Sequence, residues 1–89
     1  MTEILIDCTA IRDRTAFHNA LAQAMVFPEW YGKNLDALHD CLTDIGTDTI
    51  LRLLHWGAVE AALGSYGKAA ARVMEQADLE NPHFFVEFY

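Results

Sequence analysis

Short apolar runs alternate along the chain with segments whose apolar residues recur at helical spacing. Three of the apolar runs predict β-strands. Residues Glu3–Asp7, "EILID", form the first run, and Thr49–Trp56, "TILRLLHW", form the second. The second run is mostly apolar and rich in residues that favour strands, which is typical of a buried strand. The chain finishes with "FFVEFY", residues 84–89, which predicts a terminal strand.

The segments between these runs carry apolar residues at helical spacing. "RTAFHNALAQAMV" places Phe17, Leu21 and Met25 on one side of a helix that Asp13 or Thr15 can cap. Three more helices are predicted, in this order: Leu35 to about Ile45, with Asn34 as N-cap and Gly46 as the C-terminal break; Ala58–Leu63, which ends at Gly64; and Lys68–Leu79, which is rich in alanine.

The elements follow the order strand, two helices, strand, two helices, strand. Strands separated by helices join as parallel neighbours through right-handed crossovers. We therefore expect an α/β fold, with a small three-stranded parallel sheet packed with about four helices. A chain of 89 residues is expected to form one domain, residues 1–89, with a small core.

The net charge of the chain indicates which class of partner it can bind. Six basic residues against thirteen acidic ones leave a net charge of −7. Nucleic acids and anionic membranes attract basic faces, so this balance argues against both and favours a basic protein partner. No signal peptide is visible, and no apolar run has the roughly 18 residues of a membrane span. Cys8 and Cys41 are expected to be reduced, largely buried thiols of a cytoplasmic protein.

The segment "PEWYGKNLDALHDCLTD" places an aspartate at every fourth position, namely Asp36, Asp40 and Asp44. On a helix these lie opposite an apolar stripe made of Leu35, Leu38, Leu42 and Ile45. The aspartates could form an ordinary solvated face. However, each like-charge pair at i,i+4 costs about 0.2–0.5 kcal/mol, and only Asp36 gains from the helix dipole. A dense row of carboxylates imitates a row of phosphates, which suggests docking into a cationic pocket.

Two aromatic residues directly precede this helix. Trp30 and Tyr31 lie between Pro28 and Gly32, so they are expected in a loop. One of them can pack beneath the loop as part of the core, but burial of both is less favoured. Aromatic side chains beside a charged patch are typical anchors of protein interfaces. The loop and the acidic helix together therefore predict a protein-binding surface.

The same segment resembles the signature of the barstar family, intracellular inhibitors of secreted guanyl-specific ribonucleases. The family pattern is Leu-Pro-Glu-aromatic-Tyr-Gly-x-Asn-Leu-Asp-Ala-Leu-x-Asp-Cys-Leu-Thr, and this chain departs from it mainly by Phe27 in place of the leucine. Length and element order agree with the family over essentially the whole chain, and Trp56 matches a tryptophan after the second strand. The resemblance implies a 1:1 complex with a basic, extracellular-type, barnase-like ribonuclease. It implies no catalytic residue, metal or cofactor.

The resemblance also implies roles for individual residues. Asp40 would occupy the phosphate pocket of the nuclease, with Asp36 one turn earlier and Trp30 as a stacking aromatic. Gly32 and Asn34 would shape the loop. The complete predicted contact set is Trp30, Tyr31, Gly32, Asn34, Asp36, His39, Asp40, Thr43, Asp44, Gln76 and Glu80.

Several positions depart from the family pattern. The family often has an aromatic residue where His39 stands, and a Gly-Trp pair where Asp44 and Ile45 stand. An acidic contact from the last long helix aligns with Gln76, although Glu75 and Glu80 are close. These departures bear on the identity of the nuclease more than on the class of function.

Two other functions stay open at this point. The chain could be an immunity protein for another basic toxin. It could also be a small acid–base enzyme, because Asp36, His39 and Asp40 share one face of a helix. Three ligands on one helix rarely enclose a metal, and the chain contains neither HExxH nor CxxC. The other histidines lie on apolar elements or at their ends and are expected at the core or its edge: His18, His55 and His83.

Overall fold

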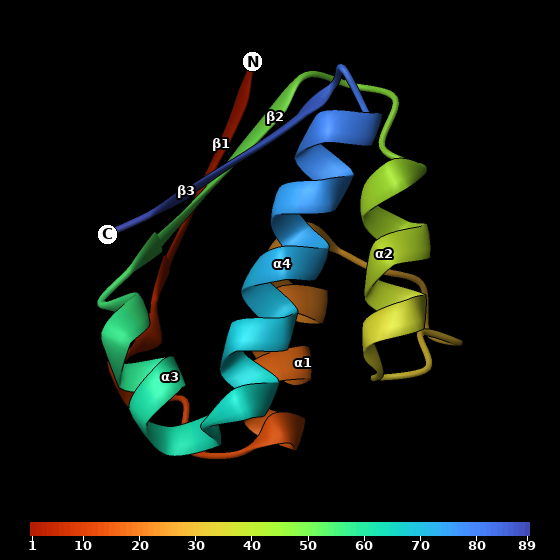
Figure 1. Cartoon of the computed structure of the whole chain (residues 1–89). Coiled ribbons are helices and arrows are strands. Elements are labelled where there is room, and N and C mark those ends of the chain that lie inside the picture. Colours follow the sequence, from red (N-terminus) through yellow and green to blue (C-terminus); the bar gives the residue numbers. More distant parts are fainter.

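The computed structural model describes all 89 residues and contains three strands, four α-helices and one short 3-10 turn (Figure 1). None of the helices combines the length and the apolar character that a membrane crossing requires. The elements are, in chain order, β1 (Thr2–Asp7), the 3-10 turn η1 (Cys8–Ala10), α1 (Arg14–Met25), α2 (Leu35–Thr43), β2 (Thr49–Leu54), α3 (Trp56–Leu63), α4 (Ser65–Glu80) and β3 (Phe84–Phe88).

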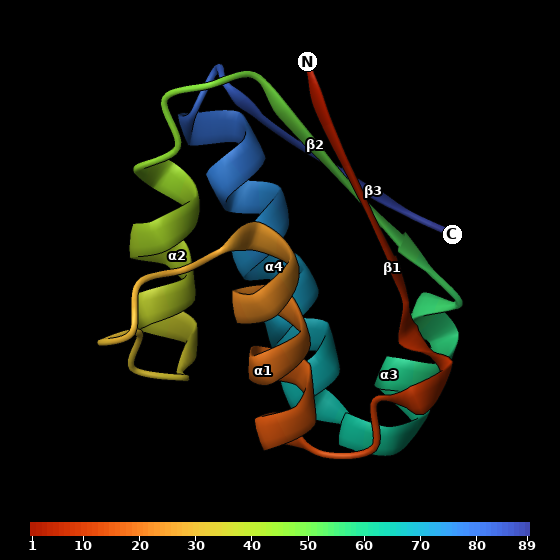
Figure 2. The same cartoon turned by 180° about the vertical axis from the view of Figure 1, so that it is seen from behind.

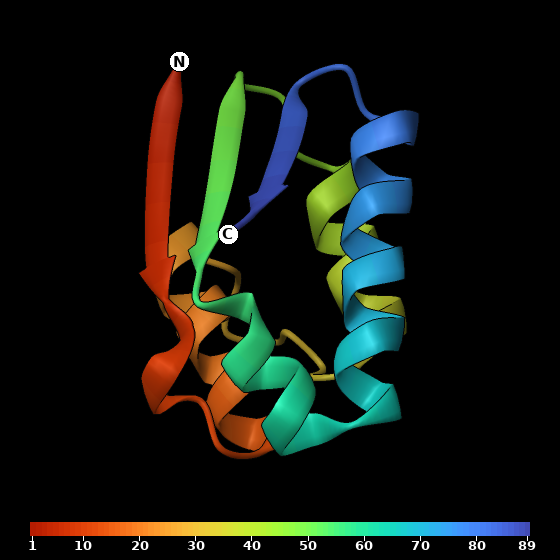
Figure 3. The same ribbon diagram turned by 60° about the vertical axis from the view of Figure 1, so that its left-hand side comes forward.

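The three strands form one parallel sheet in the order β1-β2-β3. Thr2 of β1 pairs with Thr49 of β2, which in turn pairs with Phe84 of β3. Helices α1, α2 and α4 lie on one side of the sheet, and α3 lies beyond the end of β2 (Figures 1 and 3). The predicted α/β architecture with a parallel three-stranded sheet is thus confirmed.

Helix α2 is the helix farthest from the sheet, and it packs along α4 (Figures 1 and 2). The core fills the space between the sheet and the helices. Its largest fully buried side chains include Phe17, Leu21, Leu38, Leu42, Leu51, Leu53, Met74 and Phe84. The inner face of α2 contributes to this core, so its outer face remains on the surface of the molecule.

The second strand ends two residues earlier than its apolar run suggests, at Leu54. His55 has φ 59° and ψ 43°, a left-handed conformation that turns the chain out of the strand. Trp56 then begins α3 instead of ending β2, and its ring packs against Phe17 and Phe88 with centroids 6.0 and 5.1 Å apart. Hydrophobicity alone could not separate a strand from the first turn of a buried helix.

Helix α3 ends at Gly64, as predicted, but α4 begins directly afterwards at Ser65, three residues before the predicted Lys68. Gly64 adopts φ 58°, which suits a residue without a side chain. Gly67 lies where α3 and α4 approach each other closely. A Cβ at this position would be only 3.1 Å from the Cα of Glu60. The first turn of α4 therefore packs directly on the backbone of α3.

Candidate functional site

The start of α2 is defined by its N-cap, Asn34, as the sequence predicts. The Asn34 Oδ1 accepts a hydrogen bond of 2.8 Å from the backbone N–H of Ala37. Its Nδ2 donates at 3.2 Å to the carbonyl of Gly32. A Cβ on Gly32 would lie 3.1 Å from that same Nδ2, so glycine leaves room for the cap. Lys33, between them, takes a left-handed φ of 51°, and the loop enters the helix through this turn.

The two faces of α2 are arranged as the spacing predicts. Leu38 and Leu42 are fully buried, whereas Asp36, Asp40 and Asp44 are all exposed. The helix stops at Thr43 rather than at about Ile45. Asp44 forms the C-cap with its backbone N–H on the carbonyl of Asp40, at 3.1 Å, so the expected break at Gly46 lies outside the helix. Three carboxylates thus project from one short, capped helix.

The end of α2 is held by a residue of the distant α4–β3 connection. Asn81 is buried, and its Nδ2 donates 2.9 Å hydrogen bonds to the carbonyls of both Leu42 and Ile45. Its Oδ1 accepts from the backbone N–H of His83 at 2.9 Å. The sequence marks Asn81 only as part of an Asn-Pro helix break, and nothing local shows that it fixes another helix. Both ends of α2 are therefore held by buried or capping amides.

The two loop aromatics separate into one core residue and one exposed residue. Trp30 is 81% exposed, whereas Tyr31 is 6% exposed. The Tyr31 hydroxyl lies 2.6 Å from Nδ1 of His18, whose Nε2 lies 2.7 Å from the hydroxyl of Tyr66. Burial lowers the pKa of His18, and the charge of Lys33 lowers it further. Tyr31 therefore holds the loop in place, and only Trp30 is available to a partner.

Three residues of the predicted contact set lie together where α2 meets the end of α4. Nε2 of His39 is 2.6 Å from Oε2 of Glu80, and Nε2 of Gln76 donates to Oε1 of Glu80 at 3.2 Å. The hydrogen bonds from Gln76 and then from His39 lower the pKa of the Glu80 carboxyl. Thr43, the remaining helical residue of the set, donates its hydroxyl to the carbonyl of His39 at 2.8 Å.

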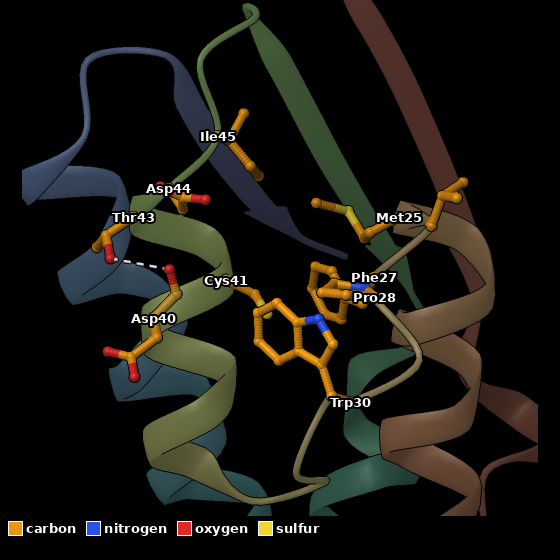
Figure 4. Close-up of a pocket in the computed structure, with 10 residues that line it drawn as sticks. Met25, Phe27, Pro28, Trp30, Asp40, Cys41, Thr43, Asp44 and Ile45 are labelled. Carbon is orange, nitrogen blue, oxygen red and sulfur yellow. Dashed lines mark hydrogen bonds between the residues drawn. The ribbon is translucent and has the colours of Figure 1, made fainter.

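Two hollows flank α2, and Asp40 is the one residue that lines both. The first, of about 540 Å³, lies between α2 and the loop after α1 (Figure 4). Its lining is mostly apolar, and the exposed Trp30 reaches from the loop toward Cys41 on α2 (Figure 4). The second, of about 570 Å³, lies between α2 and α4. The side chain of Asp40 is 87% exposed, so this carboxylate stands on the crest between the two hollows.

The residues of the acid–base alternative are not organised around a common centre. Nδ1 of His39 lies 4.0 Å from Asp40, while Nε2 of the same ring is engaged by Glu80. No group of three or more His, Cys, Asp or Glu side chains could hold a metal ion. Cys8 and Cys41 are unpaired, and burial raises the pKa of both thiols, to about 11 for Cys8.

Comparison with known proteins places this chain in a family. The family model described as "Barstar (barnase inhibitor)" matches residues 1–88. A protein of Bacillus subtilis (strain 168) named "Putative ribonuclease inhibitor YrdF" is 35% identical over 81 residues, which cover 90% of this chain and 89% of that protein. With a match over nearly the full length and the matching parallel α/β fold, this chain belongs to the barstar family.

Proposed function

We propose that this protein inhibits a basic, guanyl-specific ribonuclease of the secreted type by filling its active site with α2 and the preceding loop. The complex has one copy of each protein, and the inhibitor performs no chemistry of its own. Membership of the barstar family supports this proposal, as does the name of the Bacillus subtilis relative, which describes a ribonuclease inhibitor. Two unpaired cysteines fit an inhibitor that works in the reducing cytoplasm.

The observation that carries the proposal is the position of Asp40. Its carboxylate stands 87% exposed between two hollows, on a helix that is capped at both ends. The only basic side chain within 4.0 Å of this carboxylate in the protein itself is His39, through its Nδ1. The carboxylate is thus free to accept charge-assisted hydrogen bonds from arginine or histidine side chains that normally bind a phosphate. Little has to be ordered on binding, because the helix is already fixed.

The surroundings of Asp40 suit a cationic active site. Asp36 and Asp44 extend the negative charge one turn in each direction, and Trp30 offers an exposed aromatic face across the first hollow. A net charge of −7 favours rapid encounter with a basic protein. Because Asp40 lines both hollows and Trp30 lines the first, a partner that docks over α2 could contact the carboxylates and the aromatic side chain together.

The direct test is a titration of RNA cleavage. Increasing amounts of the purified protein are added to a bacterial guanyl-specific ribonuclease, and residual cleavage of RNA is measured. Activity should fall linearly to zero near one equivalent, and the protein alone should leave RNA intact. Asp40→Ala should lose this inhibition. Glu75→Ala, which removes an exposed carboxylate of α4 that lines neither hollow, should retain it. Cleavage of RNA by the protein alone would contradict the proposal.

A further inference from the structure

The hollow between α2 and α4 has one acidic wall and one basic wall. Asp36 and Asp40 line it from α2, and Arg72 lines it from α4. The rest of the lining is apolar at Leu35, Ala69 and Val73 and polar at His39 and Gln76. The hollow therefore offers two opposite charges across a space of about 570 Å³, beside the carboxylate on which the proposed inhibition depends.

Arg72 has no partner within the protein. Its side chain is exposed and makes neither an ion pair within 4.0 Å nor a hydrogen bond. The aspartates that share the hollow do not approach it, and Glu80, farther along α4, is engaged by His39 and Gln76. The guanidinium group thus keeps all its donors free at the edge of an otherwise acidic face.

An unpaired arginine at this place is unfavourable for a uniformly cationic partner. Arg72 would face like charges there, and its loss of hydration on binding would not be compensated. A carboxylate of the partner, in contrast, matches the planar guanidinium group in a bidentate geometry. This surface therefore favours a partner that carries a carboxylate beside its basic residues, and it disfavours a partner that carries only basic residues there.

We infer that Arg72 is a specificity-determining residue, which selects a nuclease that carries an acidic side chain next to the basic residues of its active site. This inference rests on the proposed function. The basic residues of that nuclease bind Asp36 and Asp40, and the acidic residue binds Arg72 on the opposite wall of the same hollow. Cationic nucleases without the acidic residue are inhibited more weakly.

The test uses the fact that the two possible roles of Arg72 predict opposite changes in affinity when its charge is removed. If Arg72 acts only through long-range charge, its removal makes the inhibitor more acidic and tightens binding to a basic nuclease. If Arg72 pairs with a carboxylate, the same change weakens binding. The matched control is Lys68→Gln, which removes one positive charge one turn earlier on α4, from a residue that lines neither hollow.

Inhibition constants are measured for a panel of purified bacterial guanyl-specific ribonucleases, and the one most strongly inhibited by the wild-type chain is used. Arg72→Gln should raise the inhibition constant about tenfold or more, Arg72→Glu should raise it further, and Lys68→Gln should leave it unchanged or lower it. Acidic residues around the nuclease active site are then replaced by their amides, one at a time. Against the nuclease variant that lacks the partner of Arg72, Arg72→Gln should no longer raise the inhibition constant. Thermal unfolding verifies that each variant is folded.

The outcomes separate the inference from the proposed function. If the wild-type chain inhibits a nuclease and Arg72→Gln binds it equally well or more tightly, the role of Arg72 is refuted while the inhibitor function stands. If the wild-type chain inhibits no member of the panel, both are refuted. Equal weakening by Arg72→Gln and Lys68→Gln would also refute the inference, because the effect would not depend on the hollow.

Discussion

The hydroxyl of Tyr31 lies 2.6 Å from Nδ1 of His18, inside the core and between a surface loop and helix α1. Through this contact the loop that presents Trp30 is tied to the rest of the fold. The ring of His18 continues the connection to Tyr66 of α4 at 2.7 Å. A neutral imidazole can hydrogen-bond to both tyrosine hydroxyls, because one ring nitrogen donates a hydrogen bond and the other accepts one.

The first prediction is that stability depends on pH through His18. Burial holds its folded pKa below the usual value of about 6.5, so the unfolded chain binds the proton more readily. The free energy of unfolding should therefore be highest above pH 6.5 and should fall as the pH drops toward the folded pKa. For one proton the slope is at most about 1.4 kcal/mol per pH unit.

Urea unfolding between pH 8 and pH 5 measures this dependence, with His18→Gln as the comparison. The variant should be less stable at pH 8 and should show a flatter pH profile over the same range. A wild-type profile that coincides in shape with that of His18→Gln would exclude His18 as the group responsible.

The contrast between Tyr31 and Trp30 shows what the sequence can and cannot predict. The N-cap at Asn34 and the leucine stripe of α2 depend on residues within a few positions of each other, so they could be predicted from spacing alone. Which of two adjacent aromatics is buried depends on His18, 13 positions earlier on another helix. Local sequence carries no information about that contact.

The same reasoning applies to the contacts between α2 and the C-terminal part of the chain. His39, Gln76 and Glu80 were all predicted as site residues, but their mutual hydrogen bonds join positions up to 41 residues apart. The link from Asn81 to Leu42 spans 39 residues. Such contacts become visible only when the packing of α2 on α4 is known.

The second prediction concerns Asn81. Asn81→Ala leaves the carbonyls of Leu42 and Ile45 without their donor and should lower the free energy of unfolding by about 1–3 kcal/mol. Amide hydrogen exchange in the last turn of α2 should accelerate more than exchange in the sheet. Asn19→Ala, an exposed asparagine of α1 without side-chain hydrogen bonds, is the control and should have little effect. Equal exchange rates in wild type and Asn81→Ala would contradict this role.

The third prediction concerns the rate of association with the nuclease. The exposed row of Asp36, Asp40 and Asp44 should accelerate encounter, so the association rate should fall by one or more orders of magnitude between about 10 mM and 500 mM salt. Asp44→Ala should slow association at low salt and leave dissociation nearly unchanged. Asp48→Ala should do less, because Asp48 lies beyond the end of α2 and lines neither hollow. Stopped-flow fluorescence measures both rates, and an association rate independent of salt would argue against electrostatic steering.

The last prediction is that Asp40→Ala makes the free protein more stable and the inhibitor much weaker. Asp40 lies in the middle of α2, where the helix dipole gives it little, and it forms i,i+4 like-charge pairs with both Asp36 and Asp44. Alanine is the better helix former, so the free energy of unfolding should rise by a few tenths of a kcal/mol. The contact to His39 at 4.0 Å is too long to offset this gain.

Binding should change in the opposite direction, because the cations of the nuclease would be left buried without a partner. The scale is set by charge pairs of the barnase–barstar complex, from which we expect a loss of roughly 3–7 kcal/mol. The thermal midpoint and the dissociation constant of Asp40→Ala are measured together with those of Glu75→Ala, which removes a carboxylate from α4 instead. A purely solvated aspartate would give the gain in stability with unchanged affinity. That result would remove Asp40 from the interface, because a residue that binds the cations of the nuclease cannot be lost without a loss of affinity.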